Sequence, residues 1–231
     1  MKRIVSIVSG GLDSTCFTAL RVQHCGGFQN VGLHILSFQY GQKGERELEA
    51  VKSIWSDVAE EIKVLPTEFL ASLWPGTQLT DNTVQVESNY VSSVVVPIRN
   101  AVFLTIGMAY AYSIEADELL IGSHLSDIRL TPDGEYMYPD CSPEFLRALE
   151  LSLHLGHFRK AKKPHILSPS LLNLTKPELI KLSYDVLGDK IFETWSCYLS
   201  GEKHCGKCES CVNRKKAFVV AGIKDRTEYE E

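Results

Sequence analysis

The chain has 231 residues, 44% of them hydrophobic, and a formal net charge of −5 at pH 7. This length allows one domain with a small appendage. A net negative charge provides no positive electrostatic potential to attract a phosphate backbone, so nucleic-acid partners are disfavoured. The first apolar run stops at Ser9, too early for a signal peptide, and no apolar stretch looks long enough to span a membrane. We therefore expect a soluble, cytoplasmic protein that acts on a small molecule.

Strand and helix patterns alternate along the chain. Runs of β-branched and apolar residues predict strands over 2–8, 31–38, 61–65 and 118–122. Helical spacing predicts helices over 14–22, 45–59, 99–113, 143–157, 176–187 and 212–221, with Thr175 as a cap. Residues 77–91 and 123–141 have no clear period and predict loops. The alternation indicates an α/β fold, a doubly wound and mostly parallel sheet, with residues 1–190 as the main domain and 191–231 as a small C-terminal segment.

A glycine-rich turn joins the first predicted strand to the first predicted helix, and it reads Ser9-Gly10-Gly11-Leu12-Asp13-Ser14. Glycines let backbone amides approach an anion, and the helix amino end adds a positive dipole. The turn matches neither G-x-x-x-x-G-K-[ST] nor G-x-G-x-x-G, so those two nucleotide-binding patterns are excluded. We predict phosphate binding here; the alternative is a tight turn that merely contains two glycines.

Four of the seven cysteines crowd together as Cys197-x7-Cys205-x2-Cys208-x2-Cys211. This spacing lets a loop wrap a tetrahedral metal ion, and Zn²⁺ is favoured over an iron–sulfur cluster because nothing else in the chain suggests redox chemistry. His204 lies inside the cluster, and we predict a solvated loop residue rather than a ligand. The metal would pin the C-terminal segment onto the main domain without a catalytic role.

Several motifs together resemble one family. The turn resembles the pyrophosphate-binding loop of the PP-loop ATP pyrophosphatases, and the turn combined with the late cysteines resembles the 7-cyano-7-deazaguanine synthase family over most of the chain. Further matching pieces are Tyr40-Gly41-Gln42 with Glu47 and Ala50, Val96-Pro97-x-Arg99-Asn100, Tyr138-Pro139-Asp140-Cys141 with Glu144-Phe145, Thr175-Lys176, and Thr194-Trp195-Ser196-Cys197-Tyr198.

The resemblance implies a PP-loop, HUP-like fold with a zinc-binding C-terminal segment, and an ATP-dependent C–N ligase that uses Mg²⁺ and forms AMP and pyrophosphate. In that chemistry 7-carboxy-7-deazaguanine is adenylated, ammonia displaces AMP, and a second ATP drives formation of 7-cyano-7-deazaguanine for queuosine and related deazapurines. Relatives suggest a homodimer. ATP would be held by Ser9, Gly10, Gly11, Leu12, Asp13 and Ser14.

Candidate catalytic and substrate-binding residues follow from these motifs. Asp13 and Ser14 of the turn are joined by Arg99 and Lys176, whose charges can neutralise phosphates. The Asp140 carboxylate can accept two adjacent N–H groups of a guanine-like base. The other candidate substrate-binding residues are Tyr40, Gln42, Tyr138, Glu144 and Phe145, of which Tyr138 and Phe145 either stack on the base or pack the core. Cys141 is either a nucleophile or a buried, inert thiol.

The chain departs from the family pattern at three places. Gly44 stands where a histidine is usual, Ser142 stands where an arginine is usual, and residues 128–137 replace a much shorter link. These departures surround the substrate half, so a second hypothesis is a divergent paralogue that passes the activated carboxylate to another amine, such as one on a protein, and stops at the amide. A third hypothesis is a nucleotide-binding module without turnover.

Overall fold

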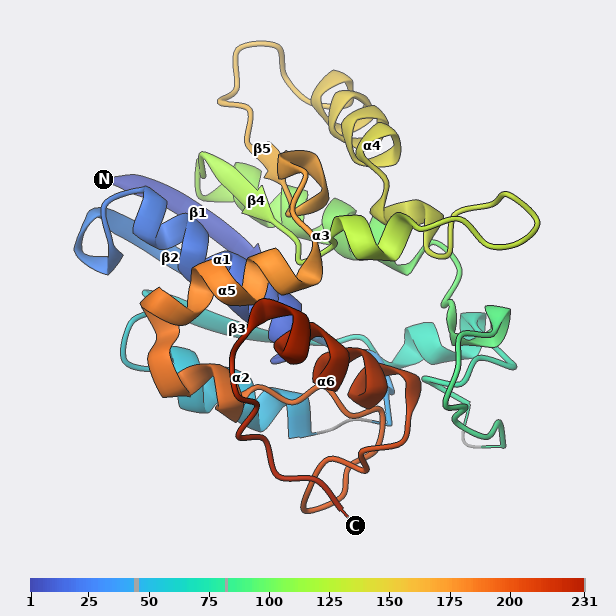
Figure 1. The fold of residues 1–231 in the computed structure, drawn as a ribbon. Coiled ribbons are helices and arrows are strands. Elements are labelled where there is room, and N and C mark those ends of the chain that lie inside the picture. The colour runs from blue at the N-terminus through green and yellow to red at the C-terminus, as the bar shows by residue number, and fades with distance from the viewer. Residues whose placement is uncertain (44–45, 82, 231) are drawn as a thin grey trace.

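The computed structural model describes residues 1–43, 46–81 and 83–230 (Figure 1). Its strands are β1 (Lys2–Ile7), β2 (Val31–Gln39), β3 (Glu61–Pro66), β4 (Glu118–Leu120) and β5 (His165–Leu167). Its α-helices are α1 (Leu12–His24), α2 (Arg46–Trp55), α3 (Arg99–Ser113), α4 (Pro143–Leu155), α5 (Lys176–Leu187) and α6 (Glu209–Ala221). Short 3-10 helices are η1 (Phe28–Asn30), η2 (Glu68–Leu73), η3 (Ser92–Val94), η4 (Leu125–Ile128), η5 (Pro139–Cys141), η6 (Ser170–Leu172) and η7 (Gly188–Glu193).

The five strands form one parallel sheet in the order β3-β2-β1-β4-β5. The first strand is central, because Ile4 is in register with Leu33 on one side and with Glu118 on the other. The predicted α/β class with a parallel sheet is therefore confirmed. Since all strands run the same way, their carboxyl ends meet at one edge, where ligands of such sheets gather.

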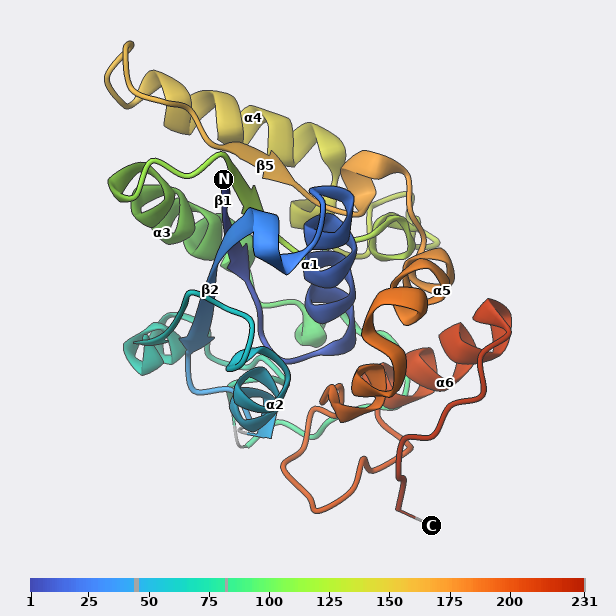
Figure 2. The same cartoon turned by 90° about the vertical axis from the view of Figure 1, so that its left-hand side faces the viewer.

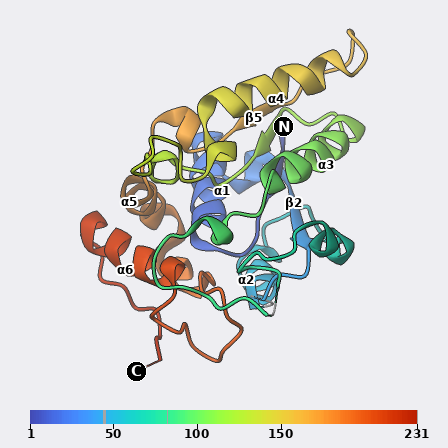
Figure 3. The same ribbon diagram turned by 90° about the vertical axis from the view of Figure 1, so that its right-hand side faces the viewer.

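Both faces of the sheet are covered by helices, as the two side views show (Figures 2 and 3). Alternate residues of a strand point to opposite faces, so Ile4 belongs to one core cluster and Val5 to the other. The cluster around Ile4 includes apolar residues of α1, α2, α5 and α6, whereas the cluster around Val5 includes those of α3 and α4. Two cores on one sheet are what a doubly wound arrangement requires.

The C-terminal segment packs into the main core. Cys208, Cys211 and Phe218 belong to the same buried cluster as Ile4 and Leu12 of the first strand and helix. Helix α6 lies beside α5 and is reached from it through η7. The boundary at residue 190 stays a prediction, and residues from both sides of it share one core.

Element bounds mostly follow the predictions. Helices α3 and α5 have the expected bounds, and Glu178 accepts a hydrogen bond from the Thr175 backbone N–H at 2.9 Å, completing a capping box at the start of α5. Helix α6 begins at Glu209 rather than 212 because Cys208 is its N-cap. Strand β5 was missed, since its three residues are too few to show alternation. The expected start of α2 at Glu45 lies outside the described residues.

One helical segment has the length and composition of a membrane span. Ser92–Ser113 has a mean hydropathy of 1.5, although no such stretch was expected from the sequence. In the fold, the α3 part of this segment packs on the sheet. Its residues Phe103, Leu104 and Met108 are buried in the core cluster that contains Val5. Apolar residues at helical spacing here serve the core of an α/β sheet.

Candidate functional site

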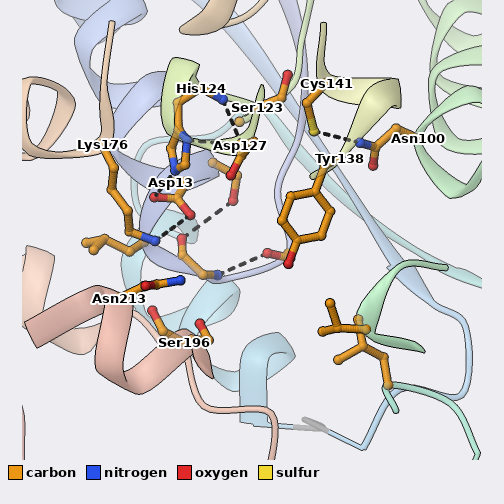
Figure 4. A pocket seen from close by; sticks show the side chains of 18 of the residues that line it. Asp13, Asn100, Ser123, His124, Asp127, Tyr138, Cys141, Lys176, Ser196 and Asn213 are labelled. Atoms are coloured by element: carbon orange, nitrogen blue, oxygen red, sulfur yellow. Dashed lines mark hydrogen bonds and ion pairs between the residues drawn. The ribbon is translucent and has the colours of Figure 1, made fainter. Parts of the chain in front are cut away.

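A cavity of about 440 Å³ opens at the carboxyl edge of the sheet. The glycine turn and the start of α5 line one end, and the segment from Met137 to Cys141 lines the other (Figure 4). The cavity wall includes most of the predicted site residues, namely Ser9, Gly11, Leu12, Asp13, Ser14, Tyr40, Gln42, Arg99, Tyr138, Asp140 and Lys176. Parallel-strand topology therefore gathers motifs that lie far apart in the sequence.

Glycine is required in the turn between β1 and α1. Gly10 has a φ of 96°, and a Cβ there would overlap the backbone carbonyl of Glu47. Gly122, after β4, approaches the same helix start so closely that a Cβ would lie 2.6 Å from the Ser14 backbone nitrogen. Gly11 is the N-cap of α1 and offers no side-chain acceptor. The first-turn N–H groups of α1 are thus left for an anion.

A chain of ion pairs runs through the nucleotide end of the cavity (Figure 4). Lys176 Nζ lies 2.9 Å from Asp13 Oδ2, and His124 Nε2 lies 3.4 Å from Asp13 Oδ1. His124 Nδ1 in turn lies 3.0 Å from Asp127 Oδ2. Burial opposes ionisation of Asp13, but the nearby Lys176 and His124 overcome it and hold the pKa of that carboxyl below its usual range. Asp13 is therefore a carboxylate at neutral pH.

His124 and Asp127 were not singled out from the sequence. Both lie in the stretch predicted to be an irregular loop. The contact of His124 to Asp13 joins segments more than a hundred residues apart, and Asp127 in turn contacts His124. Their only sequence signal is position: they follow the carboxyl end of β4, where parallel sheets place site residues.

Asp140, Tyr138 and Arg99 surround the far end of the cavity. Asp140 Oδ2 accepts a hydrogen bond from the Asn100 backbone N–H at 3.2 Å, and burial raises the pKa of its carboxyl. The guanidinium of Arg99 donates to the Tyr40 hydroxyl at 3.0 Å. Tyr138 packs edge-on against Tyr90, with ring centroids 5.6 Å apart. The Asp140 carboxylate and the Tyr138 ring are thus available on one cavity wall.

Gln42 and Glu47 also line the cavity. Gln42 bends back so that its Oε1 accepts from the Tyr40 backbone N–H at 2.9 Å. Burial raises the pKa of Glu47 to about 8, against the opposing effects of Arg99 and Gln42. A carboxyl that titrates near neutral pH inside a cavity is a candidate acid or base, a role that sequence reasoning did not assign to Glu47.

Two residues of the Tyr138-to-Phe145 motif lie outside the cavity, and a third, Cys141, lines it with a buried thiol. Glu144 is exposed on α4, and Phe145 is half-buried against the core beside α3, so neither lines the cavity. The Cys141 thiol faces Asn100 Nδ2 at 3.4 Å, and burial raises its pKa well above the ordinary value. Of the two interpretations of Cys141, the structure favours the inert thiol.

The four predicted metal ligands converge. The Sγ atoms of Cys197, Cys205, Cys208 and Cys211 all lie within 4.8 Å of one another. Backbone N–H groups of Cys205 and Leu199 each donate to Cys197 Sγ at 3.4 Å, as expected of a thiolate. In a tetrahedral zinc site with Zn–S near 2.3 Å the sulfurs lie about 3.8 Å apart. The cluster therefore fits a tetrahedral ion after a small contraction.

The prediction that His204 is a solvated loop residue was wrong. This residue is 4% exposed rather than solvated, and its ring packs on Trp195 with centroids 4.3 Å apart. Its Nε2 accepts from the Ser196 backbone N–H at 3.0 Å, and burial lowers its pKa to about 4. His204 is thus a neutral, structural histidine that orders the segment leading into the cysteine cluster.

The C-terminal segment also forms a wall of the cavity. Ser196, Asn213, Lys216 and Val220 line it together with Cys197 (Figure 4 labels the first two). Asn213, Lys216 and Val220 recur at helical spacing and so share one face of α6. Arg214, fully buried, donates to Thr194 Oγ1 at 2.8 Å and to Ser196 Oγ at 2.9 Å, which locks α6 to that wall. The sequence assigned this segment only a structural task.

Two of the departures from the family pattern have local structural explanations. The Ser142 side chain caps α4 by accepting from the Phe145 backbone N–H at 3.3 Å. Residues 128–137 form a small exposed hairpin closed by a bridge between Leu130 and Tyr136, and its bases, Arg129 and Met137, line the cavity. Gly44, the third departure, lies outside the described residues.

The fold and the cavity define a class: an α/β protein whose cavity, at the carboxyl edge of a parallel sheet, suits a phosphate-bearing ligand and lies beside a four-cysteine cluster that could hold a metal ion. A family model described as queuosine biosynthesis protein QueC matches residues 3–222. The chain belongs to this family. The resemblance stated from the sequence is thereby confirmed.

Individual relatives agree with the family model. A 7-cyano-7-deazaguanine synthase of Desulfitobacterium hafniense is 38% identical and is aligned over 99% of this chain and 94% of its own length. Synthases of Thermoplasma acidophilum and Psychromonas ingrahamii are 35% and 33% identical over the whole of this chain, and the alignments cover 93% and 99% of those proteins. The chain is therefore an enzyme of the C–N ligase type, and the hypotheses of a divergent paralogue or an inactive module are not favoured.

Proposed function

We propose that this enzyme adenylates the carboxylate of 7-carboxy-7-deazaguanine with ATP and, with ammonia, converts it to 7-cyano-7-deazaguanine. The observation that carries the proposal is the cavity, which has a phosphate-binding turn at one end and the Asp140 and Tyr138 side chains at the other. A carboxylate placed between the two ends would meet the α-phosphate of ATP, as proximity catalysis requires.

At the nucleotide end, Ser9, Gly10, Gly11, Leu12, Asp13 and Ser14 hold the pyrophosphate portion of ATP. The first-turn N–H groups of α1, which receive no side-chain cap from Gly11, support this role. Lys176 and Arg99 neutralise charge as pyrophosphate leaves. Mg²⁺, arriving with the ATP phosphates, would share that neutralisation.

At the base end, Asp140 accepts hydrogen bonds from the guanine-like edge and Tyr138 stacks on the ring, flanked by Tyr40 and Gln42. Glu144 and Phe145, which do not line the cavity, contribute by positioning α4 beside it. The reaction runs in two ATP-dependent stages. Carboxylate oxygen first attacks the α-phosphorus, and ammonia then displaces AMP to form the amide. The amide oxygen next attacks a second ATP, and loss of AMP with two protons leaves the nitrile.

The cysteine cluster is proposed to bind Zn²⁺ as a structural ion. Four thiolates with a closed coordination sphere leave no open position for substrate. What the ion supplies is folding free energy for the segment 196–217, which forms part of the cavity wall.

We further propose a cytoplasmic homodimer. The surface of α4 exposes Leu151 and Leu155, at 60% and 76% of their maximal areas, one turn apart on a single helix face. An apolar stripe of this kind is suited to pairing with a second copy. Light scattering of the wild type and of Leu155→Glu measures the mass; a monomeric wild type would exclude the dimer.

The test of function incubates the pure protein with ATP, Mg²⁺, 7-carboxy-7-deazaguanine and ammonium, and follows AMP by chromatography and the base by mass spectrometry. The nitrile with two AMP per product is the expected result. An accumulated amide, or transfer to an amine on an added protein, would instead mean that the nitrile step is absent. No AMP would overturn the proposal. The same assay of AMP formation is run on Lys176→Ala, which removes the lysine proposed to neutralise the phosphates. Lys162→Ala, on the exposed loop before β5, is its control.

A further inference from the structure

His124 occupies an unusual position between two carboxylates. Its ring is 3% exposed and lies between Asp13 of the glycine turn and Asp127 of η4, at 3.4 Å and 3.0 Å (Figure 4). Asp127 Oδ2 also accepts from the His124 backbone N–H at 2.9 Å, which fixes the ring relative to η4. The two carboxylates come from different elements, α1 and η4, and His124 is the connection between them.

The arrangement raises a question of charge at the phosphate site. Lys176 Nζ lies 2.9 Å from Asp13, and this is the lysine proposed to neutralise the ATP phosphates. A lysine that turns toward a phosphate leaves Asp13, and an unpaired carboxylate at that place would repel the incoming anion. A second cation beside Asp13 removes this conflict.

We infer that His124 is a positioning residue that holds a positive charge against Asp13, so that Lys176 is free to pair with the ATP phosphates. The inference rests on the proposed use of ATP at this turn. Asp127 keeps the imidazolium in place from the other side, and the Tyr138 backbone N–H donates to the Asp127 carbonyl at 3.1 Å, so η4 is itself anchored to the base end.

The protonation state supports this role. Burial alone would disfavour a charged imidazole, but Asp127 and Asp13 outweigh it and raise the pKa of His124 to about 10. The charged groups that face this site are Asp13 from α1, Asp127 from η4 and, beyond Asp13, Lys176 from α5. The imidazolium is therefore retained at neutral pH.

The test compares His124→Gln with His34→Gln. His34 is also buried, at 7% exposed, and also lies near carboxylates, those of Glu60 and Glu61, but it does not line the cavity. Affinity for α,β-methylene-ATP with Mg²⁺ is measured by calorimetry, which needs no deazaguanine. We expect His124→Gln to weaken this binding at least about tenfold, and His34→Gln to leave it within about twofold.

Steady-state kinetics and stability add two independent readouts. In His124→Gln the KM for ATP rises while the KM for 7-carboxy-7-deazaguanine changes by less than about twofold. A histidine with a raised pKa contributes stability that is complete below about pH 6.5 and is lost as the pH rises toward 10. The stability difference between the wild type and His124→Gln therefore shrinks over this pH range.

Unchanged affinity for the ATP analogue in His124→Gln would overturn the inference, as would a stability difference that is constant from pH 6.5 to 10. If the wild type binds the analogue more tightly than His124→Gln does but makes no AMP with the deazaguanine, the proposed function is wrong and the inference on His124 stands. A wild type that does not bind the analogue would overturn both.

Discussion

At the scale of single residues, the proposed recognition of the base depends on Asp140. Its Oδ2 accepts from the Asn100 backbone N–H, its Oδ1 lies 3.9 Å from the Cys141 thiol, and the residue lines the cavity. Because a carboxylate is an acceptor only, it matches a pair of N–H donors and rejects acceptors at the same place.

Asp140→Asn should therefore impair base binding selectively. The amide replaces one acceptor with a donor, so we expect the KM for 7-carboxy-7-deazaguanine to rise by about 10- to 100-fold with little change in affinity for an ATP analogue. Steady-state kinetics and calorimetry measure the two quantities. Asp133→Asn, on the exposed hairpin, is the matched control. Equal losses for base and nucleotide would contradict a base-reading role.

Glu47 makes stability depend on pH. Its carboxyl stays protonated in the fold up to a pKa of about 8 but ionises near 4.5 when unfolded, so the folded state binds more protons between these values. Its contribution to stability is complete below pH 4.5 and is lost as the pH rises to about 8. Relative to the wild type, Glu47→Gln should thus gain in unfolding temperature from pH 4.5 to 8 and then level off. Glu49→Gln, exposed on the same helix, should show a flat difference.

At the scale of elements, the turn between β1 and α1 is defined by crowding as well as by dihedral angle. Gly10 and Gly134 both have positive φ, at 96° and 84°. A Cβ on Gly10 would overlap the Glu47 carbonyl, whereas a Cβ on Gly134 would meet nothing within 4 Å. Comparing substitutions at Gly10 and Gly134 therefore separates the effect of crowding from the effect of the positive φ.

Gly134→Ala should cost about 1 kcal/mol of unfolding free energy, from the dihedral angle alone. Gly10→Ala should cost at least about 2 kcal/mol more and should weaken ATP binding, because either the turn or α2 must move. Denaturant unfolding of both variants measures the difference. Equal losses of unfolding free energy in the two variants would show that the Glu47 carbonyl does not crowd a Cβ at position 10.

Much of the element pattern could be predicted from the sequence because it is local. The bounds of α3 and α5 follow from apolar spacing and from the Thr175–Glu178 capping box. Strand β5 could not be predicted, since three residues carry no period and its pairing with β4 is supplied by the sheet.

The same distinction holds for the site. The turn, Lys176 and the cysteines carry motif signals, and the structure brings each to its expected neighbours. His124, Asn213 and the burial of His204 depend on contacts between distant segments, which no local pattern records. Sequence reasoning therefore found the groups with strong chemistry and missed those that orient them.

At the scale of the whole molecule, the four-cysteine cluster and the cavity share one wall. Cys197 lies in both, and Arg214 ties α6 to Ser196 on the cavity wall. Loss of the proposed metal ion should therefore affect nucleotide binding, although the ion takes no part in the proposed reaction.

Cys205→Ser should lower the unfolding temperature, release zinc and weaken binding of an ATP analogue by at least about tenfold. Cys25→Ser, which replaces a similarly half-buried cysteine at the end of α1, should change none of the three. Metal analysis, thermal unfolding and calorimetry on the same preparations give the answer. If metal-free Cys205→Ser bound the ATP analogue with full affinity, nucleotide binding would not depend on the cysteine cluster.

The wall formed by α6 also sets an order of events during synthesis. The glycine turn leaves the ribosome early, but the helix that closes the cavity over it is translated about two hundred residues later. Strands β1 and β2 can pair while the chain is still being made, since domains fold progressively from the amino end. ATP therefore has no finished pocket to enter on a nascent chain, and the proposed zinc ion can be held by all four thiols only after Cys211 has been translated.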